Sequence, residues 1–279
     1  MLELDFIIKK ALEEDLREGD HTTLSIIPPD TIGSAKLLIK DTGVLAGVEV
    51  AKKVFEIFDP GLQTDVFITD GSHVKPGDIA FEVKGSARSI LQTERLVLNI
   101  MQRMSGIATQ TAQYVKAVEG TKAKILDTRK TTPCVRLLEK TAVKIGGGYN
   151  HRFGLYDMIL IKDNHIDFAG GIEQAIDRVH AYLKARGLNL KIEIEVRNFD
   201  ELEQVIKKGG VNRIMLDNFT PQQVAKAVKL IAGRYETEAS GGITLENIRE
   251  YALAGVDYIS VGALTHQIKS LDMSLKKNI

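Results

Sequence analysis

The sequence contains few of the residues that mark specialised classes of protein. Its 279 residues include no tryptophan, one cysteine and six prolines. A single cysteine cannot form an internal disulfide, and no Cys/His spacing typical of a zinc site is present. The chain also lacks a net charge, because 37 Lys and Arg residues balance 37 Asp and Glu residues. A global basic field for nucleic acid is therefore excluded, and any attraction for anions has to be local.

Long apolar runs are missing as well. No stretch reaches the roughly 20 apolar residues that cross a bilayer. The N-terminal segment MLELDFIIKKALEEDLREGD is acidic and amphipathic, unlike the basic start and apolar core of a signal peptide. With 44% hydrophobic and 27% charged residues, the composition is that of a globular protein with a sizeable core. We therefore expect a cytoplasmic protein, either an enzyme or a binding protein.

The first third of the chain mixes helical and strand-like patterns. Helical spacing of apolar residues covers residues 4–17 and 48–58. Short strand-like runs occupy residues 35–39, 64–68 and 79–83, and DGSHVKPGDIAFEVKG predicts a tight turn between antiparallel strands. These patterns predict a mixed α+β, sandwich-like domain over residues 1–105.

The remaining residues, 106–279, show a different rhythm. After a helical pattern over residues 90–118, six short and mostly apolar runs alternate with helical segments: AKILD, DMILI, KIEIEV, RIML, ETEAS and YISVG. Such alternation indicates parallel βα units. Six strands are too few for a closed eight-stranded barrel, so an open, incomplete parallel α/β barrel is predicted, with a doubly wound sheet as the alternative. We expect the last helix and the tail LDMSLKKNI to pack back on the first domain.

Cationic side chains follow the first two predicted strands of this region. Arg129 and Lys130 come directly after the first strand, Lys162 ends the second, and His151 and Arg152 lie in the loop between them. The carboxyl ends of parallel strands meet at one edge, where active sites of α/β folds lie. Several cations gathered there predict a polyanionic ligand. A solvated surface cluster is the alternative.

Two carboxylates end the next two strands. Glu195 and Asp217 are predicted to face the cations, where they could hold Mg²⁺, ribose hydroxyls or a developing positive charge. The alternative is an internal salt bridge to Lys130 or Lys162.

The last two strands end in glycine-containing loops. Ser240, Gly241 and Gly242 follow the fifth strand and Gly262 follows the sixth. Glycine lets backbone N–H groups approach an anion closely, so this pair of loops predicts a phosphate site. Upstream, Thr132-Pro133 is predicted to begin a helix, with Cys134 in its first turn and without a catalytic role.

With these residues in view, the sequence closely resembles the quinolinate phosphoribosyltransferase family, also called nicotinate-nucleotide pyrophosphorylase (carboxylating). The resemblance covers nearly the whole chain in the stretches EGDHTT, ERLVLNIMQRMSGIAT, DTRKTTPCVR, GGGYNHRFGLYDMILIKDNHI, IEIEV, MLDNF, EASGGI and ISVGALTH. It implies an N-terminal α/β domain, an open C-terminal barrel and a homodimer. It implies a reaction of quinolinate with phosphoribosyl pyrophosphate, with Mg²⁺, that yields nicotinate mononucleotide, pyrophosphate and CO₂ for NAD biosynthesis.

The resemblance also implies roles for individual residues. Arg129, His151 and Arg152 match positions that hold the quinolinate carboxylates, and Arg95 matches one that reaches the neighbouring subunit's site. The other matches are Lys130 and Lys162 near both substrates and the pyrophosphate, Glu195 and Asp217 at the ribose, and Ser240, Gly241, Gly242 and Gly262 at the 5′-phosphate.

Three positions depart from the family pattern. Cys134 stands where glycine is usual, Thr141 where tyrosine is frequent, and Gln267 where serine is usual. None removes a charge that the reaction needs. The alternatives are a pyrophosphorylase-like protein associated with molybdate transport, a nicotinate phosphoribosyltransferase, and an anion-binding protein without catalysis. The intact set of Arg95, Arg129, His151 and Arg152 argues against the first. A nicotinate phosphoribosyltransferase would need fewer cations, because its substrate has one carboxylate, and an anion-binding protein would have no need of Glu195 and Asp217.

Overall fold

The computed structural model describes residues 2–278, which form two compact units. The first unit comprises the residues up to Ala112, the segment Thr131–Gly147 and the residues from Leu264 onward. The second comprises Gln113–Lys130 and Gly148–Ala263. This division differs from a boundary at residues 105 and 106, since two later segments return to the first unit. No helix among the described residues is long and apolar enough to cross a membrane.

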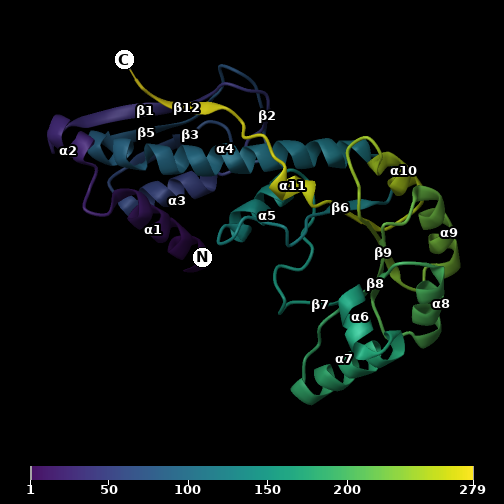
Figure 1. The fold of residues 1–279 in the computed structure, drawn as a ribbon. Helices are drawn as coiled ribbons and strands as arrows, with labels where there is room; N and C mark the ends of the chain where they lie inside the picture. Colours follow the sequence, from purple (N-terminus) through teal and green to yellow (C-terminus); the bar gives the residue numbers. More distant parts are fainter. Residues whose placement is uncertain (1, 279) are drawn as a thin grey trace. The chain divides into compact units, whose positions relative to one another are not determined.

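The first unit contains a four-stranded antiparallel sheet with the order β12-β1-β5-β3 and a separate two-stranded sheet of β2 and β4 (Figure 1). Its strands are β1 (Ile32–Ile39), β2 (Gly43–Val44), β3 (Gln63–Val66), β4 (His73–Val74), β5 (Ile79–Ser86) and β12 (Met273–Lys277). Its helices include α1 (Leu2–Leu16), α2 (His21–Ile26), α3 (Val48–Phe58) and α5 (Arg136–Ile145). The predicted mixed α+β character of this part is confirmed.

Helix α3 shows why these residues fold as they do. Its apolar positions recur at helical spacing, so Val50, Val54 and Phe55 are buried on one face. The ring of Phe55 meets Phe81 of β5 edge-on, with ring centroids 6.0 Å apart. In β1, burial alternates along the strand as expected for a sheet with one covered face. Sheet and helix therefore share one core.

One sequence-based expectation for this unit needs correction. The strands on either side of the turn at residues 75–78 do not pair with each other, because β4 pairs with β2 and β5 pairs with β1 and β3. The turn itself forms, with the Lys75 N–H donating to the Asp78 carboxylate. The tail LDMSLKKNI returns to this unit, where Met273–Lys277 form β12 and pair antiparallel with β1.

The second unit is built on a six-stranded parallel sheet with the order β6-β11-β10-β9-β8-β7. The strands are β6 (Lys124–Leu126), β7 (Ile159–Ile161), β8 (Ile192–Val196), β9 (Arg213–Asp217), β10 (Glu236–Ser240) and β11 (Tyr258–Ser260). All six agree with the predicted strands. The strands follow one another around the sheet without the reversal of order that marks a doubly wound sheet, and β6 and β7 lie at its two edges, so the predicted open barrel is confirmed.

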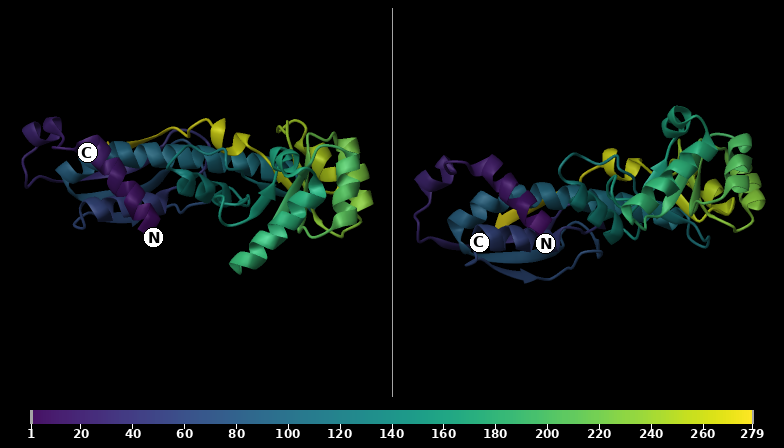
Figure 2. Two further views of the ribbon diagram at one scale, coloured as in Figure 1. Left: turned by 60° about the horizontal axis from the view of Figure 1, so that its bottom comes forward. Right: turned by 90° about the horizontal axis from the view of Figure 1, so that it is seen from below.

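Helices connect the strands of this unit and cover the outside of the sheet (Figure 2). They are α6 (Asp163–Ala169), α7 (Ile172–Arg186), α8 (Phe199–Lys208), α9 (Pro221–Ile231) and α10 (Ile248–Leu253). Asn198 caps α8 by accepting from the Glu201 N–H, and Thr220 with Pro221 begins α9. Because all six strands run parallel, the carboxyl end of each lies at the same edge of the barrel.

Two helices contribute residues to both units. The long helix α4 (Ala87–Ala117) crosses the boundary at Ala112, and the short helix α11 (Ala263–His266) crosses it at Ala263. The predicted helix over residues 90–118 is thereby confirmed.

Candidate active site

The carboxyl ends of the parallel strands form a polar mouth within the second unit. Strand register places Asp217 opposite Ser240, and Glu195 beside Met215 on the neighbouring strand. Every residue predicted for the site except Arg95 belongs to this unit. Arg95 lies on α4 in the first unit, where its side chain is exposed.

The two guanidinium groups of the mouth are close enough to influence each other. Arg152 is only 9% exposed, and its Nη1 donates to the Met158 carbonyl at 3.3 Å. Burial lowers the pKa of Arg152, and the charge of Arg129 lowers it further. Arg129 itself is exposed in the turn after β6. Two neighbouring cations, one of them desolvated, are stabilised when an anion binds between them.

The carboxylates of the mouth face a lysine. Nζ of Lys162 lies 3.5 Å from Oε2 of Glu195, which agrees with the salt bridge considered from the sequence. Burial raises the pKa of Glu195; Lys162 lowers it and Asp217 raises it again. Burial likewise raises the pKa of Asp217, while a hydrogen bond from Asn218 and the charges of Lys162 and Lys130 lower it. These mutual effects show that Lys130, Lys162, Glu195 and Asp217 share one electrostatic environment.

The glycine loop after β10 has a backbone that favours glycine. Gly241 and Gly242 have positive φ angles of 94° and 62°. A Cβ atom at Gly241 would collide with the Asn218 side chain, so a larger residue cannot occupy that position without movement. Helix α10 begins only at Ile248, several residues later, so its N-terminus does not directly follow these glycines. Gly262, in contrast, immediately precedes α11.

The loop before β7 returns along the open edge of the barrel. Tyr149 forms a parallel bridge with Leu126 of β6, and its N–H donates to the Ile125 carbonyl at 2.8 Å. The next turn is fixed by buried Asp127, whose Oδ1 accepts from the His151 N–H at 2.9 Å. The buried position of the carboxylate and the register of the loop therefore set where His151 and Arg152 lie.

The ring of His151 is directed into the barrel. Its Nε2 lies 2.9 Å from Oε2 of Glu193 and 3.5 Å from Oε2 of Glu238, and all three side chains are almost fully buried. Arg213, at the amino end of β9, also contacts this group. Its Nη1 lies 2.9 Å from Oε2 of Glu238, and its Nη2 lies 3.1 Å from Oε2 of Glu236. These interior charges were missed as site residues. Their signal in the sequence is the glutamate at every second position of IEIEV and ETEAS, which places both glutamates of a strand on one face.

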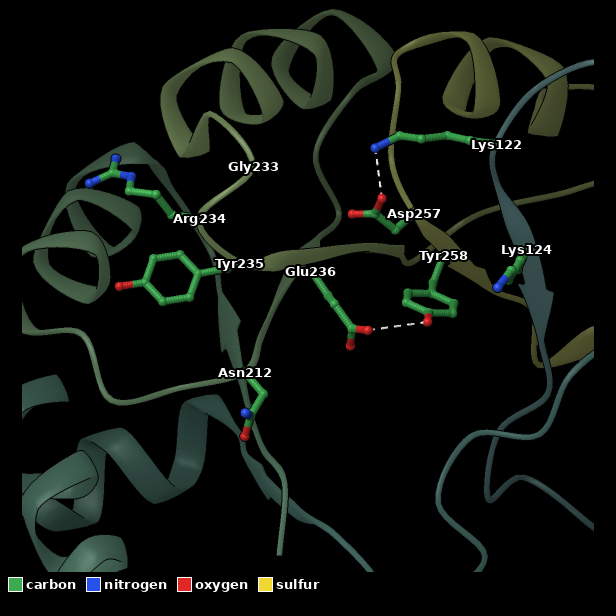
Figure 3. A pocket seen from close by; sticks show the side chains of 9 residues that line it. All are labelled: Lys122, Lys124, Asn212, Gly233, Arg234, Tyr235, Glu236, Asp257 and Tyr258. Carbon is green, nitrogen blue, oxygen red and sulfur yellow. Dashed lines mark hydrogen bonds and ion pairs between the residues drawn. The ribbon is translucent and has the colours of Figure 1, made fainter.

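The opposite end of the barrel contains a separate pocket (Figure 3). Its volume is about 650 Å³, and it is lined by residues at the amino ends of β6, β9, β10 and β11, namely Lys122, Lys124, Asn212, Gly233, Arg234, Tyr235, Glu236, Asp257 and Tyr258. Lys122 pairs with Asp257 at 2.6 Å and the Tyr258 hydroxyl donates to Glu236 at 3.3 Å. This lower pocket therefore combines three cations, Lys122, Lys124 and Arg234, with two carboxylates, Glu236 and Asp257.

The segment after β6 differs locally from the sequence-based expectation. Helix α5 begins at Arg136, and its N-cap Val135 makes no side-chain capping bond. The Thr132 hydroxyl instead accepts from Arg103, and Cys134 is an exposed loop residue with a φ of 67°. The expectation that Thr132-Pro133 begins the helix, with Cys134 in its first turn, is wrong. The left-handed backbone at Cys134 favours glycine.

Comparisons with known proteins agree with this architecture. Residues 20–105 match the family model "Quinolinate phosphoribosyl transferase, N-terminal domain", and residues 107–276 match the model of the C-terminal domain. The chain is 45% identical to quinolinate phosphoribosyltransferase [decarboxylating] 1b of Nicotiana tabacum, over 98% of this chain and 82% of that protein. It is 42% identical to the probable nicotinate-nucleotide pyrophosphorylase [carboxylating] of Bacillus subtilis, over 98% and 93% respectively.

A solved structure shares the fold of this chain. The crystal structure of NadC from Streptococcus pyogenes superposes with a TM-score of 0.93 at 42% identity, covering 99% of this chain and 96% of that one. Both domains, their order and the barrel are therefore shared with these proteins. The chain belongs to the quinolinate phosphoribosyltransferase family.

Proposed function

We propose that the protein transfers the phosphoribosyl group of phosphoribosyl pyrophosphate to quinolinate and releases pyrophosphate and CO₂. The product is nicotinate mononucleotide, a precursor of NAD. The observation that carries this proposal is the pair of guanidinium groups at the mouth, buried Arg152 and the neighbouring Arg129, in the same unit as the ion pair of Lys162 with Glu195. The printed names of the relatives, which include "decarboxylating", support the same reaction.

Arg129 and Arg152 are suited to bind the two carboxylates of the pyridine ring. A guanidinium group presents a planar fork of donors that matches a carboxylate. Because Arg152 is desolvated, an ion pair formed there is screened less than one at an exposed surface. By resemblance, His151 belongs to the same subsite, but in this structure its ring contacts Glu193 below the mouth. Its contribution to the carboxylate site is therefore proposed to include the placement of Arg152.

The acidic and basic groups suit the charge separation of the reaction. The bond between ribose C1 and the pyrophosphate oxygen breaks, and its electron pair leaves with pyrophosphate. Glu195 and Asp217 are proposed to stabilise the positive charge that develops on the sugar, and Lys130 and Lys162 the negative charge on the leaving group. The pyridine nitrogen donates its electron pair to C1.

Loss of CO₂ follows from the product of that step. The C–C bond to the carboxylate next to the ring nitrogen breaks, and its electron pair remains on the ring carbon, where the adjacent pyridinium charge stabilises it. A proton then takes the place of the carboxylate. The reaction needs no covalent intermediate with the enzyme, so positioning and electrostatics suffice.

Mg²⁺ is proposed to enter with phosphoribosyl pyrophosphate. Carboxylate oxygens are the ligands that this hard cation prefers, and Glu195 and Asp217 provide them on neighbouring strands. The charge of Asp217 raises the pKa of Glu195, so a cation between the two would relieve their repulsion. When bound, Mg²⁺ would neutralise charge on the leaving group.

The 5′-phosphate is proposed to bind at the glycine loops. Ser240, Gly241, Gly242 and Gly262 supply backbone and hydroxyl groups at the ends of β10 and β11. The left-handed conformation of Gly241 and Gly242 supports a close approach of backbone to an anion.

The active unit is proposed to be a homodimer in which Arg95 of the partner subunit completes the quinolinate site. This role is inferred from the family resemblance of ERLVLN, and the exposure of Arg95 on α4 is compatible with it.

Turnover of two related substrates tests the proposed function. The purified protein is supplied with phosphoribosyl pyrophosphate, Mg²⁺ and either quinolinate or nicotinate, while nucleotide formation and CO₂ release are followed. We expect equal amounts of nicotinate mononucleotide and CO₂ from quinolinate and little reaction of nicotinate. Turnover of nicotinate alone would indicate a non-decarboxylating transferase. A folded protein that binds phosphate but turns over neither substrate would be an anion-binding protein.

A further inference from the structure

A buried group of three side chains joins the mouth to the interior of the barrel. One nitrogen of His151 and one carboxylate oxygen each of Glu193 and Glu238 lie within 4.8 Å of one another. Both glutamates have no exposed surface, and the His151 side chain is 6% exposed. Burying two carboxylates is costly unless they interact with specific partners, so their arrangement requires an explanation.

The hydrogen bonds of His151 define how its ring is held. Nδ1 accepts the Arg152 N–H at 2.7 Å, so this nitrogen carries no proton in the arrangement seen. Nε2 is then the nitrogen left to carry the ring proton, and it lies 2.9 Å from Oε2 of Glu193. Because one nitrogen contacts a core glutamate and the other contacts the backbone of Arg152, the ring connects these two residues.

The neighbouring guanidinium groups argue for a positioning role rather than a metal site. Arg213 contacts Oε2 of Glu238 at 2.9 Å, and the charge of Arg152 acts on Glu193. A metal ion among the three side chains would be repelled by both cations. Those two guanidinium groups already supply positive charge beside the glutamates, and the His151 imidazole is the group that both carboxylates contact.

We propose that Glu193 and Glu238 are positioning residues that fix the ring of His151 and thereby hold Arg152 in place for a quinolinate carboxylate. This inference rests on the proposed function. Arg152 is coupled to Glu193 in two ways, through the His151 ring and through the direct effect of their charges. Neither glutamate touches the reacting atoms, so their loss should weaken quinolinate binding more than it affects phosphoribosyl pyrophosphate.

The test is a comparison of Glu193→Met with Glu193→Gln. Methionine fills a similar volume but accepts no strong hydrogen bond, whereas glutamine keeps an acceptor for Nε2. We expect the KM for quinolinate to rise about 10-fold or more in Glu193→Met, the loss typical of a charge-assisted hydrogen bond. The KM for phosphoribosyl pyrophosphate should stay unchanged, and Glu193→Gln should recover most of the affinity.

Glu236→Met is the matched control. Glu236 also pairs with Arg213, at 3.1 Å, but it lines the lower pocket (Figure 3) and does not belong to the His151 group. Its replacement should leave the KM for quinolinate unchanged. An equal rise in Glu236→Met would overturn the positioning role in favour of a general loss of core charge. Equal effects of Glu193→Met and Glu193→Gln would show a purely electrostatic effect on Arg152 and overturn it as well.

A measurement on the wild-type protein covers the case in which Glu193→Met does not fold. Nitrogen NMR of labelled histidine reports which ring nitrogen of His151 carries the proton. We expect the proton on Nε2, whereas a proton on Nδ1 would contradict the proposal. The outcomes are separable from failure of the proposed function. Wild-type protein that does not turn over quinolinate refutes that function, whereas normal quinolinate kinetics in Glu193→Met refute only the positioning role.

Discussion

At the scale of single residues, the backbone conformation at Cys134 determines which residue type is favoured there more than side-chain chemistry does. Cys134 has a φ of 67° in an exposed loop, a conformation that costs an L-residue about 1–2 kcal/mol. The family usually has glycine there. The residue was expected in a helix, because its neighbours Thr132 and Pro133 have the composition of a helix start. In the structure the Thr132 hydroxyl accepts a hydrogen bond from Arg103 instead of capping a helix, a tertiary contact that local sequence does not encode.

Replacement of Cys134 by glycine should therefore stabilise the protein. Glycine removes the left-handed strain but costs chain entropy in the unfolded state, so the net gain should be about 0.5–1 kcal/mol in the free energy of unfolding. Chemical denaturation of Cys134→Gly measures it. Cys134→Ala keeps the strain and serves as control, and a gain of the same size in that variant would show that strain is not the cause.

A buried carboxylate gives a pH dependence that can be traced to one residue. Burial raises the pKa of Glu238 from 4.5 to about 8, with the charge of Glu193 as the next cause. The folded state therefore holds this proton more tightly than the unfolded state. Stability is highest below pH 4.5 as far as this group is concerned, and falls as pH rises toward 8.

Glu238→Gln should remove that contribution. The amide resembles the protonated acid, so the variant should gain stability relative to wild type between about pH 5 and pH 8, by at most about 1.4 kcal/mol per pH unit. Urea denaturation of both proteins across this range provides the comparison. A difference between them that is independent of pH would show that Glu238 is ionised in the folded protein throughout.

At the scale of elements, the parallel strands were predictable because each is a short apolar run followed by a helical pattern. The polar strand ends were predictable for the same reason, since topology alone brings them to one edge. The direction of the His151 ring was not predictable. It depends on the bridge between Tyr149 and Leu126, which is a contact between segments distant in sequence. The pairing of β4 with β2 was missed for the same reason, because proximity along the chain suggested a hairpin.

Helices α4 and α5 are joined by a buried ion pair that should be important for the first unit. Nη2 of Arg103 lies 2.6 Å from Oε1 of Glu139, which is 1% exposed, and Oε2 of Glu139 accepts from the Thr132 N–H. Arg103→Leu leaves the carboxylate buried without its cation. We expect the free energy of unfolding to fall by about 2–3 kcal/mol, allowing for the partial exposure of Arg103.

The double variant Arg103→Leu/Glu139→Leu tests whether the unpaired carboxylate causes the loss of stability. Removing both charges eliminates the uncompensated carboxylate, so part of the lost stability should return. Thermal or urea denaturation of the two single variants and the double variant forms the cycle. Additive losses would show that the pair does not interact.

At the scale of the whole molecule, catalysis is proposed to require two subunits. If Arg95 acts in the partner's site, Arg95→Ala and Lys130→Ala damage different halves of each composite site. Each variant alone should be nearly inactive. After subunit exchange, mixed dimers contain one site with both residues intact, so activity should reappear. Native mass spectrometry establishes that mixed dimers have formed, and their inactivity would refute a shared site.

The proposed function requires that the mouth at the carboxyl ends of the strands, and not the lower pocket, binds the dicarboxylate. A crystal structure of the protein with quinolinate shows which of the two sites the dicarboxylate occupies. We expect one carboxylate of the ligand at Arg152 and the other at Arg129, with the ring nitrogen toward Glu195 and Asp217. Quinolinate bound instead among Lys124, Arg234 and Tyr258, with the mouth unoccupied, would contradict it.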